Sequence, residues 1–328
     1  MSRIESHVRK EKFSEKKGKK IGIMVICVLL LLPGCTGPAE NTITISGAWA
    51  LYPLMVTWAE EYCALHPSIR IDVSAGGAGK GMADVLGGLT DMGMVSRKIY
   101  PEEIAKGAFY VAVAKDAVIP IMNKNNPHLS HILSTGISRD TFCELYISGS
   151  ISTWGDVLGM QSITDTIQLY TRSDACGAAQ TWALYLDHAQ EDLRGVGVYG
   201  DPGIVEAVGR DIFGIGFANL NFAYDAASGV PAPGVVAVPI DFNENGVIDD
   251  HENFYSDKSQ VMNAIVAGWY SSPPARELYL VTNGYPSGLT RDFLLWILTE
   301  GQKYVEETGY ISLGTKIQTE LEKIGGHS

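Results

Sequence analysis

The stretch ITISGAWALYPL, residues 43–54, runs from an alternating apolar segment through a glycine into a segment of helical character. The alternation predicts a β-strand over 42–46. Pro53 suits the first turn of a helix, because a residue there needs no amide hydrogen bond. A glycine between the two lets the backbone approach a ligand closely. The stretch therefore predicts a strand, a glycine turn and a helix over 53–65.

The same plan occurs twice more along the chain. SAGGAGKGM, residues 74–82, follows a predicted strand at 69–74, and TRSDACGAAQTW, residues 171–182, follows one at 166–171. The first amides of a helix lack partners within the helix and carry partial positive charge, so such turns are typical anion sites. The segment GAGKG at 77–81 has neither the P-loop nor the dinucleotide-binding spacing. Glycine-rich turns also occur without any ligand, so the argument depends on all three together.

Strand and helix patterns alternate along most of the chain, which favours an α/β fold with mostly parallel sheets. Further strands are expected at 109–113, 117–122, 214–218, 235–240 and 278–282, and further helices at 80–89, 139–147, 178–187, 202–209, 257–268 and 290–307. No linker divides the chain, so we expect two lobes with more than one crossing between them. The expected boundaries are 42–115 with 253–328 for lobe I, and 116–252 for lobe II.

The N-terminus has the features of an export signal. Eight basic residues in positions 1–20 precede a twelve-residue apolar run at 21–32. A bilayer span needs about 20 residues, so this run is too short to cross a membrane and is typical of a signal peptide. Gly34 before Cys35 resembles a lipobox, the alternative being a plain signal peptide with a chance cysteine. We expect a signal peptide over 1–34, lipidation of Cys35, a tether over 35–41, and attachment to the outer face of the cytoplasmic membrane.

The chain carries 25 basic and 37 acidic residues, for a net charge of −12, and the signal segment holds many of the basic ones. Such acidity argues against nucleic-acid binding. An anionic ligand would need local positive potential. After Cys35, the mature chain has three cysteines, Cys63, Cys143 and Cys176, which are too few for a disulfide framework.

Taken in order, these segments resemble the phosphate-binding proteins of ABC transporters over nearly all of residues 42–313. The similar segments are ITISGAWALYPL, residues 75–97, GSISTWGDV at 149–157, TRSDACGAA at 171–179, and residues 203–220, 271–284 and 293–313. The resemblance implies a two-lobed fold of the type II periplasmic binding proteins that closes over phosphate. It also implies a receptor that works with ABC permease and ATPase subunits and has no catalytic residue. With the lipobox-like Gly34-Cys35 pair, we expect this receptor to be a lipid-anchored monomer.

In that family, loop amides, hydroxyls and an arginine hold the phosphate. The ligand-binding residues that the resemblance implies here are Ala48, Trp49, Ala50, Gly77, Gly79, Ser96, Arg97, Arg172, Asp174, Cys176, Gly177 and Ala178. This chain departs from the pattern where hydroxyls are expected, at Ala48, Trp49, Cys176 and Ala178. A buried group left without its partner costs about 1–3 kcal/mol. Another oxyanion or a small acid therefore stays open as the ligand.

A second predicted site is independent of the family. DFNENGVIDDHE, residues 241–252, matches the calcium-loop template D-x-[DN]-x-[DN]-G-x5-E. The predicted ligands are Asp241, Asn243, Asn245, the Val247 carbonyl, Asp249 and Glu252. Calcium takes six to eight oxygens, and Gly246 permits the sharp turn. We expect a structural Ca²⁺ here, the alternative being an Asx-rich turn that binds no metal.

Two other classes of protein compete with a transport receptor. One is a ligand-sensing surface lipoprotein without a transporter. The other is a secreted hydrolase, but the chain shows no Ser-His-Asp order, HExxH motif or paired carboxylates. Cys176 beside Arg172 resembles an activated thiol, yet no histidine lies near it in sequence. We therefore expect a binding protein and no enzyme.

Overall fold

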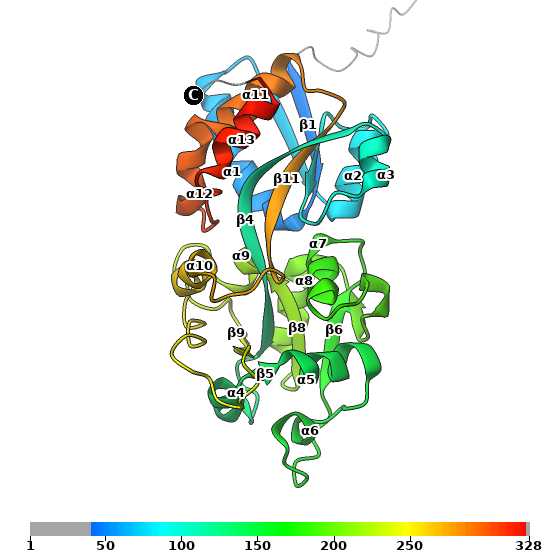
Figure 1. Ribbon diagram of the computed structural model, residues 1–328, viewed down its shortest axis with the longest axis vertical. Coiled ribbons are helices and arrows are strands. Elements are labelled where there is room, and N and C mark those ends of the chain that lie inside the picture. The colour runs from blue at the N-terminus through cyan, green and yellow to red at the C-terminus, as the bar shows by residue number, and fades with distance from the viewer. Residues whose placement is uncertain (1–40, 326–328) are drawn as a thin grey trace, which may run out of the picture. The chain divides into compact units, whose positions relative to one another are not determined.

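The computed structural model describes residues 41–325, which lie within one compact unit, Glu40–Ser328. This unit forms two lobes (Figure 1), and each has its own hydrophobic core. Trp58 and Phe293 are fully buried in the core of lobe I, and Trp154, Trp182 and Phe217 in the core of lobe II. The two-lobed α/β architecture expected from the sequence is confirmed.

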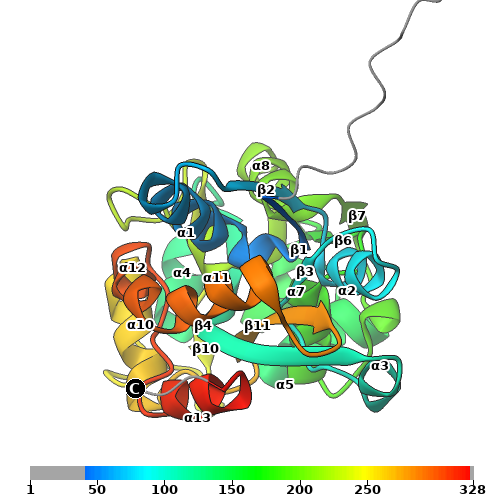
Figure 2. The ribbon, with the colours of Figure 1, turned by 90° about the horizontal axis from the view of Figure 1, so that it is seen from above.

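Lobe I is a five-stranded mixed sheet between two layers of helices. Its strand order is β2 (Arg70–Ala75), β1 (Thr42–Gly47), β3 (Met92–Val95), β11 (Ala275–Asn283) and β4 (Ala108–Asn123). Seen from above, α1, α11 and α12 lie on one side of the sheet and α2 on the other (Figure 2). The helices are η1 (Trp49–Leu51), α1 (Tyr52–Leu65), α2 (Ala78–Leu86), α3 (Pro101–Ala105), α11 (Gly288–Leu298), η4 (Glu300–Gln302), α12 (Lys303–Glu307) and α13 (Lys316–Lys323).

Lobe II is built on the far half of β4, which pairs with β8 (Gly214–Asn219) and β9 (Val235–Ala237). The sheet continues in parallel through β6 (Gln168–Arg172) to β7 (Val196–Val198), and β5 (Ile137–Ser138) pairs with β10 (Ile240–Asp241). Its helical segments are α4 (Leu129–Thr135), α5 (Arg139–Cys143), η2 (Glu144–Ser148), α6 (Trp154–Leu158), α7 (Gly177–Tyr185), η3 (Gln190–Asp192), α8 (Gly200–Arg210), α9 (Leu220–Ala223) and α10 (Lys258–Ala267).

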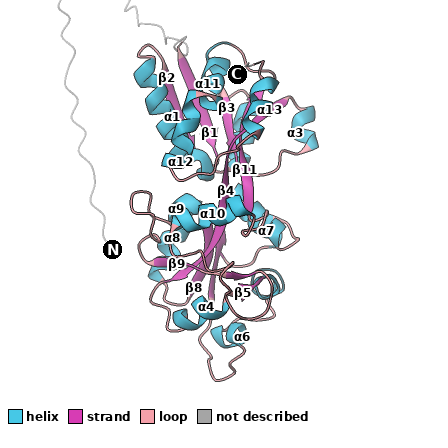
Figure 3. Ribbon diagram, turned by 60° about the vertical axis from the view of Figure 1, so that its left-hand side comes forward, coloured by secondary structure: helices cyan, strands magenta, loops and turns pink. Residues whose placement is uncertain are grey.

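Two antiparallel strands, β4 and β11, link the lobes (Figure 3). The sequence predicted two strands, 109–113 and 117–122, where the structure has the single 16-residue strand β4. The polar residues Lys115 and Asp116 lie in the gap between the two predicted strands. The strand continues because β11 pairs with it there, and Asp116 is fully buried.

The predicted lobe boundary at residue 253 is wrong. Phe254, Tyr255, Val261 and Tyr270 pack into the core of lobe II, and the Tyr270 hydroxyl donates to the Val118 carbonyl at 2.5 Å. The chain returns to lobe I only along β11. A helix pattern such as that of α10 shows that one face is buried, but it does not show against which lobe.

Two further elements differ from expectation. The predicted helix over 290–307 is interrupted, because Thr299 has a non-helical backbone with φ −114° and ψ −97°, and η4 and α12 follow it. Strand β3 was not predicted. Its residues, MGMV, are all buried, so no alternation of apolar and polar residues marks it.

The predicted signal peptide and Cys35 lie outside the described residues. Within residues 41–325, no helix combines the length and apolar character needed to cross a membrane. Cys63, Cys143 and Cys176 are all free thiols.

Candidate functional site

The turns predicted to bind an anion come together from both lobes. The Gly79 amide of lobe I donates to the Ala175 carbonyl of lobe II at 3.0 Å. Gly177 lies directly against Ser96, and only a residue without a Cβ fits there. Gly77 lies against Asp174 and Ala175 in the same way. We call this meeting point of the loops after β1, β2, β3 and β6 the loop cluster.

Some amides of the loop cluster are occupied and others are free. The amide of Ala48 donates to Met94 O at 2.9 Å, and that of Gly77 to Gly47 O at 3.0 Å. With Gly79 also bonded, these three predicted ligand donors are used by the protein itself. By contrast, the first-turn amides of Trp49, Ala50, Gly177 and Ala178 donate to no acceptor among residues 41–325. The two on α7 are the free donors at the start of a nine-residue helix.

The side chain of Trp49, a predicted ligand residue, packs between the lobes. Its ring lies edge-on to Tyr199 at 6.1 Å and to Phe222 at 6.3 Å, measured between ring centroids. Its indole nitrogen is buried and has no hydrogen-bond partner among the described residues. Trp49 therefore contributes an aromatic contact between the lobes where the family resemblance implied a ligand contact.

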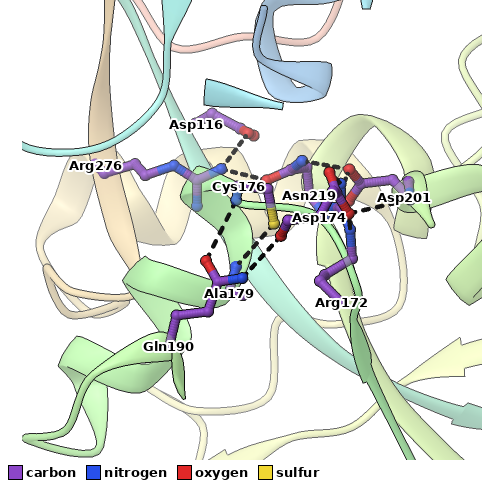
Figure 4. Close-up of polar contacts among 10 residues, drawn as sticks. Asp116, Arg172, Asp174, Cys176, Ala179, Gln190, Asp201, Asn219 and Arg276 are labelled. Atoms are coloured by element: carbon purple, nitrogen blue, oxygen red, sulfur yellow. Dashed lines mark hydrogen bonds and ion pairs between the residues drawn. The ribbon is translucent and has the colours of Figure 1, made fainter. Parts of the chain in front are cut away.

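Arg172 is fully buried beneath the loop cluster and is held by two carboxylates (Figure 4). Its guanidinium donates to both oxygens of Asp174 at 2.8 and 2.7 Å and to Asp201 Oδ2 at 2.6 Å. Burial lowers the pKa of Arg172, but the neighbouring Asp201 and Asp174 carboxylates outweigh that effect and raise it. Arg172 is thus charged, rigid and largely neutralised, so it contributes less positive potential to a ligand than its residue type suggests.

A second buried ion pair, Arg276 with Asp116, was missed by the sequence analysis. The Arg276 guanidinium lies 3.5 Å from Asp116 Oδ2 and also donates to Asn219, which in turn donates to Asp201 (Figure 4). Burial raises the pKa of Asp116 to about 7, although Arg276 opposes the shift. The segment 271–284 is one of those that carry the family resemblance, but nothing in its sequence pattern singles out Arg276.

The remaining predicted residues have structural partners. Arg97 forms a two-pronged pair with Glu103, at 2.9 and 2.6 Å, and lies over the Tyr100 ring. Burial raises the pKa of the Cys176 thiol to about 12, and its sulfur accepts the Ala179 amide at 3.4 Å. Such a thiol is protonated at neutral pH and unsuited to nucleophilic attack. Cys176 acts as the N-cap of α7.

A cavity of about 850 Å³ lies between the lobes beside the loop cluster, and we call it the lateral groove. It is bounded by the loop after β3, the outer face of α7, the segment after α10 and the start of β11. Three of its lining residues connect it to the loop cluster. Arg97 belongs to the loop after β3, Gln190 accepts the Cys176 amide at the start of α7, and Arg276 donates to Asn219, which in turn donates to Asp201. The lateral groove and the loop cluster therefore share a wall.

The predicted calcium loop forms a turn closed by its own hydrogen bonds. Asp241 Oδ2 accepts the Gly246 amide at 2.8 Å, and Glu252 Oε1 accepts the Phe242 amide at 2.7 Å. Asp249 accepts the side-chain amide of Asn243 at 2.7 Å. In the described part of the chain, no three His, Cys, Asp or Glu side chains are grouped so as to hold a metal ion.

The chain is similar over most of its length to proteins named phosphate-binding proteins. It is 28% identical to the phosphate-binding protein PstS of Pseudomonas aeruginosa, with 83% of each chain covered. It is 22% identical to PstS of Methanocaldococcus jannaschii, with 89% of this chain and 90% of the relative covered.

The fold is also that of solved binding proteins. A putative phosphate ABC transporter substrate-binding protein with bound phosphate from Clostridium perfringens superposes with a TM-score of 0.66 at 23% identity, covering 83% of this chain and all of that one. An ABC-type phosphate transport receptor from Vibrio cholerae gives 0.58 at 19% identity, covering 82% and 99%. The model of the PBP superfamily domain matches residues 35–300. Since this match spans most of the sequence, the chain belongs to the PBP superfamily.

Proposed function

We propose that this protein is the extracytoplasmic receptor of an ABC importer and binds phosphate between its two lobes. One observation carries the proposal: strand-end loops of both lobes meet where the free amides of Gly177 and Ala178 open α7. A helix start of this kind binds oxyanions through its amides and its dipole. The relatives named phosphate-binding proteins support phosphate as the anion.

The chemistry of this site is binding by fixed donors, with no step of bond making. Backbone N–H groups donate and never accept, so they favour an anion with unprotonated oxygens. Arg172 supplies a guanidinium whose position is fixed by Asp174 and Asp201. The pair of carboxylates reduces the local positive charge, so we expect the amides to provide most of the attraction. No enzymatic activity is proposed.

Calorimetry of the mature chain from residue 35 onward, produced with Cys35→Ser so that it carries no lipid, tests this proposal. Phosphate should bind with 1:1 stoichiometry, and sulfate, molybdate and tungstate should bind at least about tenfold more weakly. Preferential binding of one of those other oxyanions would replace phosphate as the ligand. Absence of binding by all four would refute the receptor proposal for oxyanions and favour the sensing-lipoprotein alternative.

We further propose that Cys35 is lipidated, so that the receptor is tethered as a monomer at the outer face of the membrane. The basic segment, the short apolar run and the Gly34-Cys35 pair support this. We also propose that residues 241–252 bind Ca²⁺, because every position of the calcium-loop template is met.

A further inference from the structure

The lateral groove is much larger than inorganic phosphate requires. Its volume of about 850 Å³ falls in the range of about 300–1,000 Å³ that is typical of sites for small organic molecules. A phosphate ion needs the space of a few water molecules, at about 30 Å³ each. The groove also has an apolar wall, formed by Tyr100, Leu184, Ile265, Tyr270, Pro273 and Tyr279. Such a wall contributes nothing to the binding of a bare oxyanion.

The charges around the groove favour an anionic molecule. Four cationic side chains line it against two acidic ones: Arg97, Lys98, Lys115 and Arg276 against Glu191 and Glu277. Arg97 is paired with Glu103, Arg276 with Asp116 and Glu277 with Lys316, so the lining charges left without an ion-pair partner among the described residues are Lys98 and Lys115 against Glu191. In a chain of net charge −12, this local excess of positive charge attracts anions to the groove.

Buried polar atoms at the groove wall lack partners. The Arg276 side chain is more than nine-tenths buried, and its Nε and Nη1 have no hydrogen-bond partner among the described residues. The Gln180 Oε1 atom is buried and unpartnered as well. A buried polar group without a partner is costly, so these atoms indicate a ligand with matching groups. A hydroxyl group matches both, because it donates to an amide oxygen and accepts from a guanidinium.

We propose that the ligand of this cleft is a polyol or sugar phosphate. Its phosphate group lies at the loop cluster, and its hydroxyl-bearing body lies in the lateral groove against Gln180 and Arg276. This inference rests on the proposed function and specifies its substrate class. Two contacts make the arrangement continuous: Gln190 lines the groove and accepts the Cys176 amide at 3.3 Å, and Arg97 follows Ser96 in the chain.

Calorimetry with inorganic phosphate, glycerol 3-phosphate and glucose 6-phosphate, and with glycerol and glucose as unphosphorylated controls, tests the inference. At least one ester should bind at least about tenfold more tightly than inorganic phosphate, and the unphosphorylated controls should not bind. If inorganic phosphate binds as tightly as or more tightly than both esters, the inference is overturned while the receptor function stands. If no phosphate compound binds, the proposed function itself is refuted.

A variant of the groove wall gives an independent readout. Gln180→Met keeps the length of the side chain and removes its hydrogen-bonding groups, so it should weaken the better ester about tenfold and leave inorganic phosphate unchanged. Because the replaced oxygen is unpartnered, the melting temperature should not fall. Gln318→Met, at an exposed position of α13, is the matched control and should change neither affinity. Equal affinities of the ester for Gln180→Met and the wild type would refute the proposed placement.

Discussion

Two residues at the start of α7 depart from the pattern of the phosphate-binding proteins that the chain resembles. Cys176 and Ala178 stand where the family resemblance implies hydroxyls, and both are buried. The Cys176 sulfur still caps the helix by accepting the Ala179 amide. The cap is thus retained, whereas a hydroxyl donor toward an anion is not.

Restoring both hydroxyls, as Cys176→Ser with Ala178→Thr, should strengthen the binding of inorganic phosphate. A hydrogen bond to a charged group contributes about 1.5–3 kcal/mol, which corresponds to a gain of roughly tenfold to a hundredfold. Calorimetry against phosphate measures this gain. An unchanged affinity in a variant of unchanged melting temperature would show that these positions do not face the anion.

Arg172 is expected to matter for stability as well as for binding. Arg172→Ala leaves Asp174 and Asp201 without their shared counter-charge in a fully buried place. Breaking a buried pair in this way costs about 3–5 kcal/mol. Urea unfolding should show a correspondingly lower midpoint, and a midpoint equal to that of the wild type would contradict this account.

The raised pKa of Asp116 makes the free energy of unfolding depend on pH, and the sign of this dependence follows from the direction of the shift. Burial raises its pKa from 3.8 to about 7, so the folded protein binds this proton more tightly than the unfolded chain does. The stabilisation is complete below about pH 4 and is lost as the pH rises through 7. At about 1.36 kcal/mol per pKa unit, the loss is at most about 4 kcal/mol.

Asp116→Asn should therefore remove this part of the pH dependence. Urea unfolding at several values from pH 4 to pH 8 compares the slopes of the variant and the wild type. The Asp84→Asn variant is a suitable control: hydrogen bonds from Lys80 and Ser46 outweigh burial and lower the pKa of Asp84, so it titrates below this range and its removal should leave the slope above about pH 5 unchanged. Parallel curves for Asp116→Asn and the wild type would refute the assignment.

At the scale of elements, local patterns predicted the strand–turn–helix units well. The alternation in TITIS, the glycine after it and Pro53 at the helix start are all local signals, and β1 and α1 form where they were expected. Strand β3 left no such signal, because it is buried on both faces. The lobe to which α10 belongs depends on tertiary packing, which periodicity does not encode.

The same distinction applies to the candidate site. The loops that form it were predicted from glycine turns and the family resemblance, and the structure brings them together. The pair Arg276 and Asp116 was missed because it joins β11 to β4, two strands far apart in sequence. The use of the Ala48 and Gly77 amides by neighbouring carbonyls also follows only from the three-dimensional contacts.

The loop over 241–252 yields a prediction about stability. Three carboxylates, from Asp241, Asp249 and Glu252, occur within twelve residues of the sequence, and the proposed cation would offset their mutual repulsion on binding. Binding to the folded form alone contributes about 2.7 kcal/mol at a hundredfold excess over Kd. Millimolar Ca²⁺ should raise the melting temperature, and EDTA should lower it.

Glu252→Gln should abolish most of the Ca²⁺-dependent shift and leave phosphate affinity nearly unchanged. Glu244→Gln, at an exposed position of the same loop outside the template, is the matched control and should keep the shift. A melting temperature indifferent to both Ca²⁺ and EDTA would refute the calcium proposal.

At the scale of the whole molecule, the proposed lipidation of Cys35 gives a prediction about location. Cys35→Ser should release the protein from the membrane fraction, because the lipid anchor would be lost while export continues. Immunoblotting of membrane and soluble fractions measures the release. Retention of the variant in the membrane fraction would contradict lipidation at Cys35.

The path of β4 and β11 has a consequence for how the protein is made. Lobe II is an insertion between two halves of lobe I, whose sheet is incomplete until β11 enters between β3 and β4. As the chain emerges from its N-terminus, lobe II is complete in sequence while lobe I still lacks a central strand and α11, α12 and α13. Lobe II is therefore free to acquire its structure first, whereas in lobe I the open edge of β3 and the lobe I half of β4 stay unpaired until β11 arrives. A nascent chain that stops before Ala275 would carry one finished lobe and one exposed apolar sheet, which makes it a natural client for chaperones and proteases.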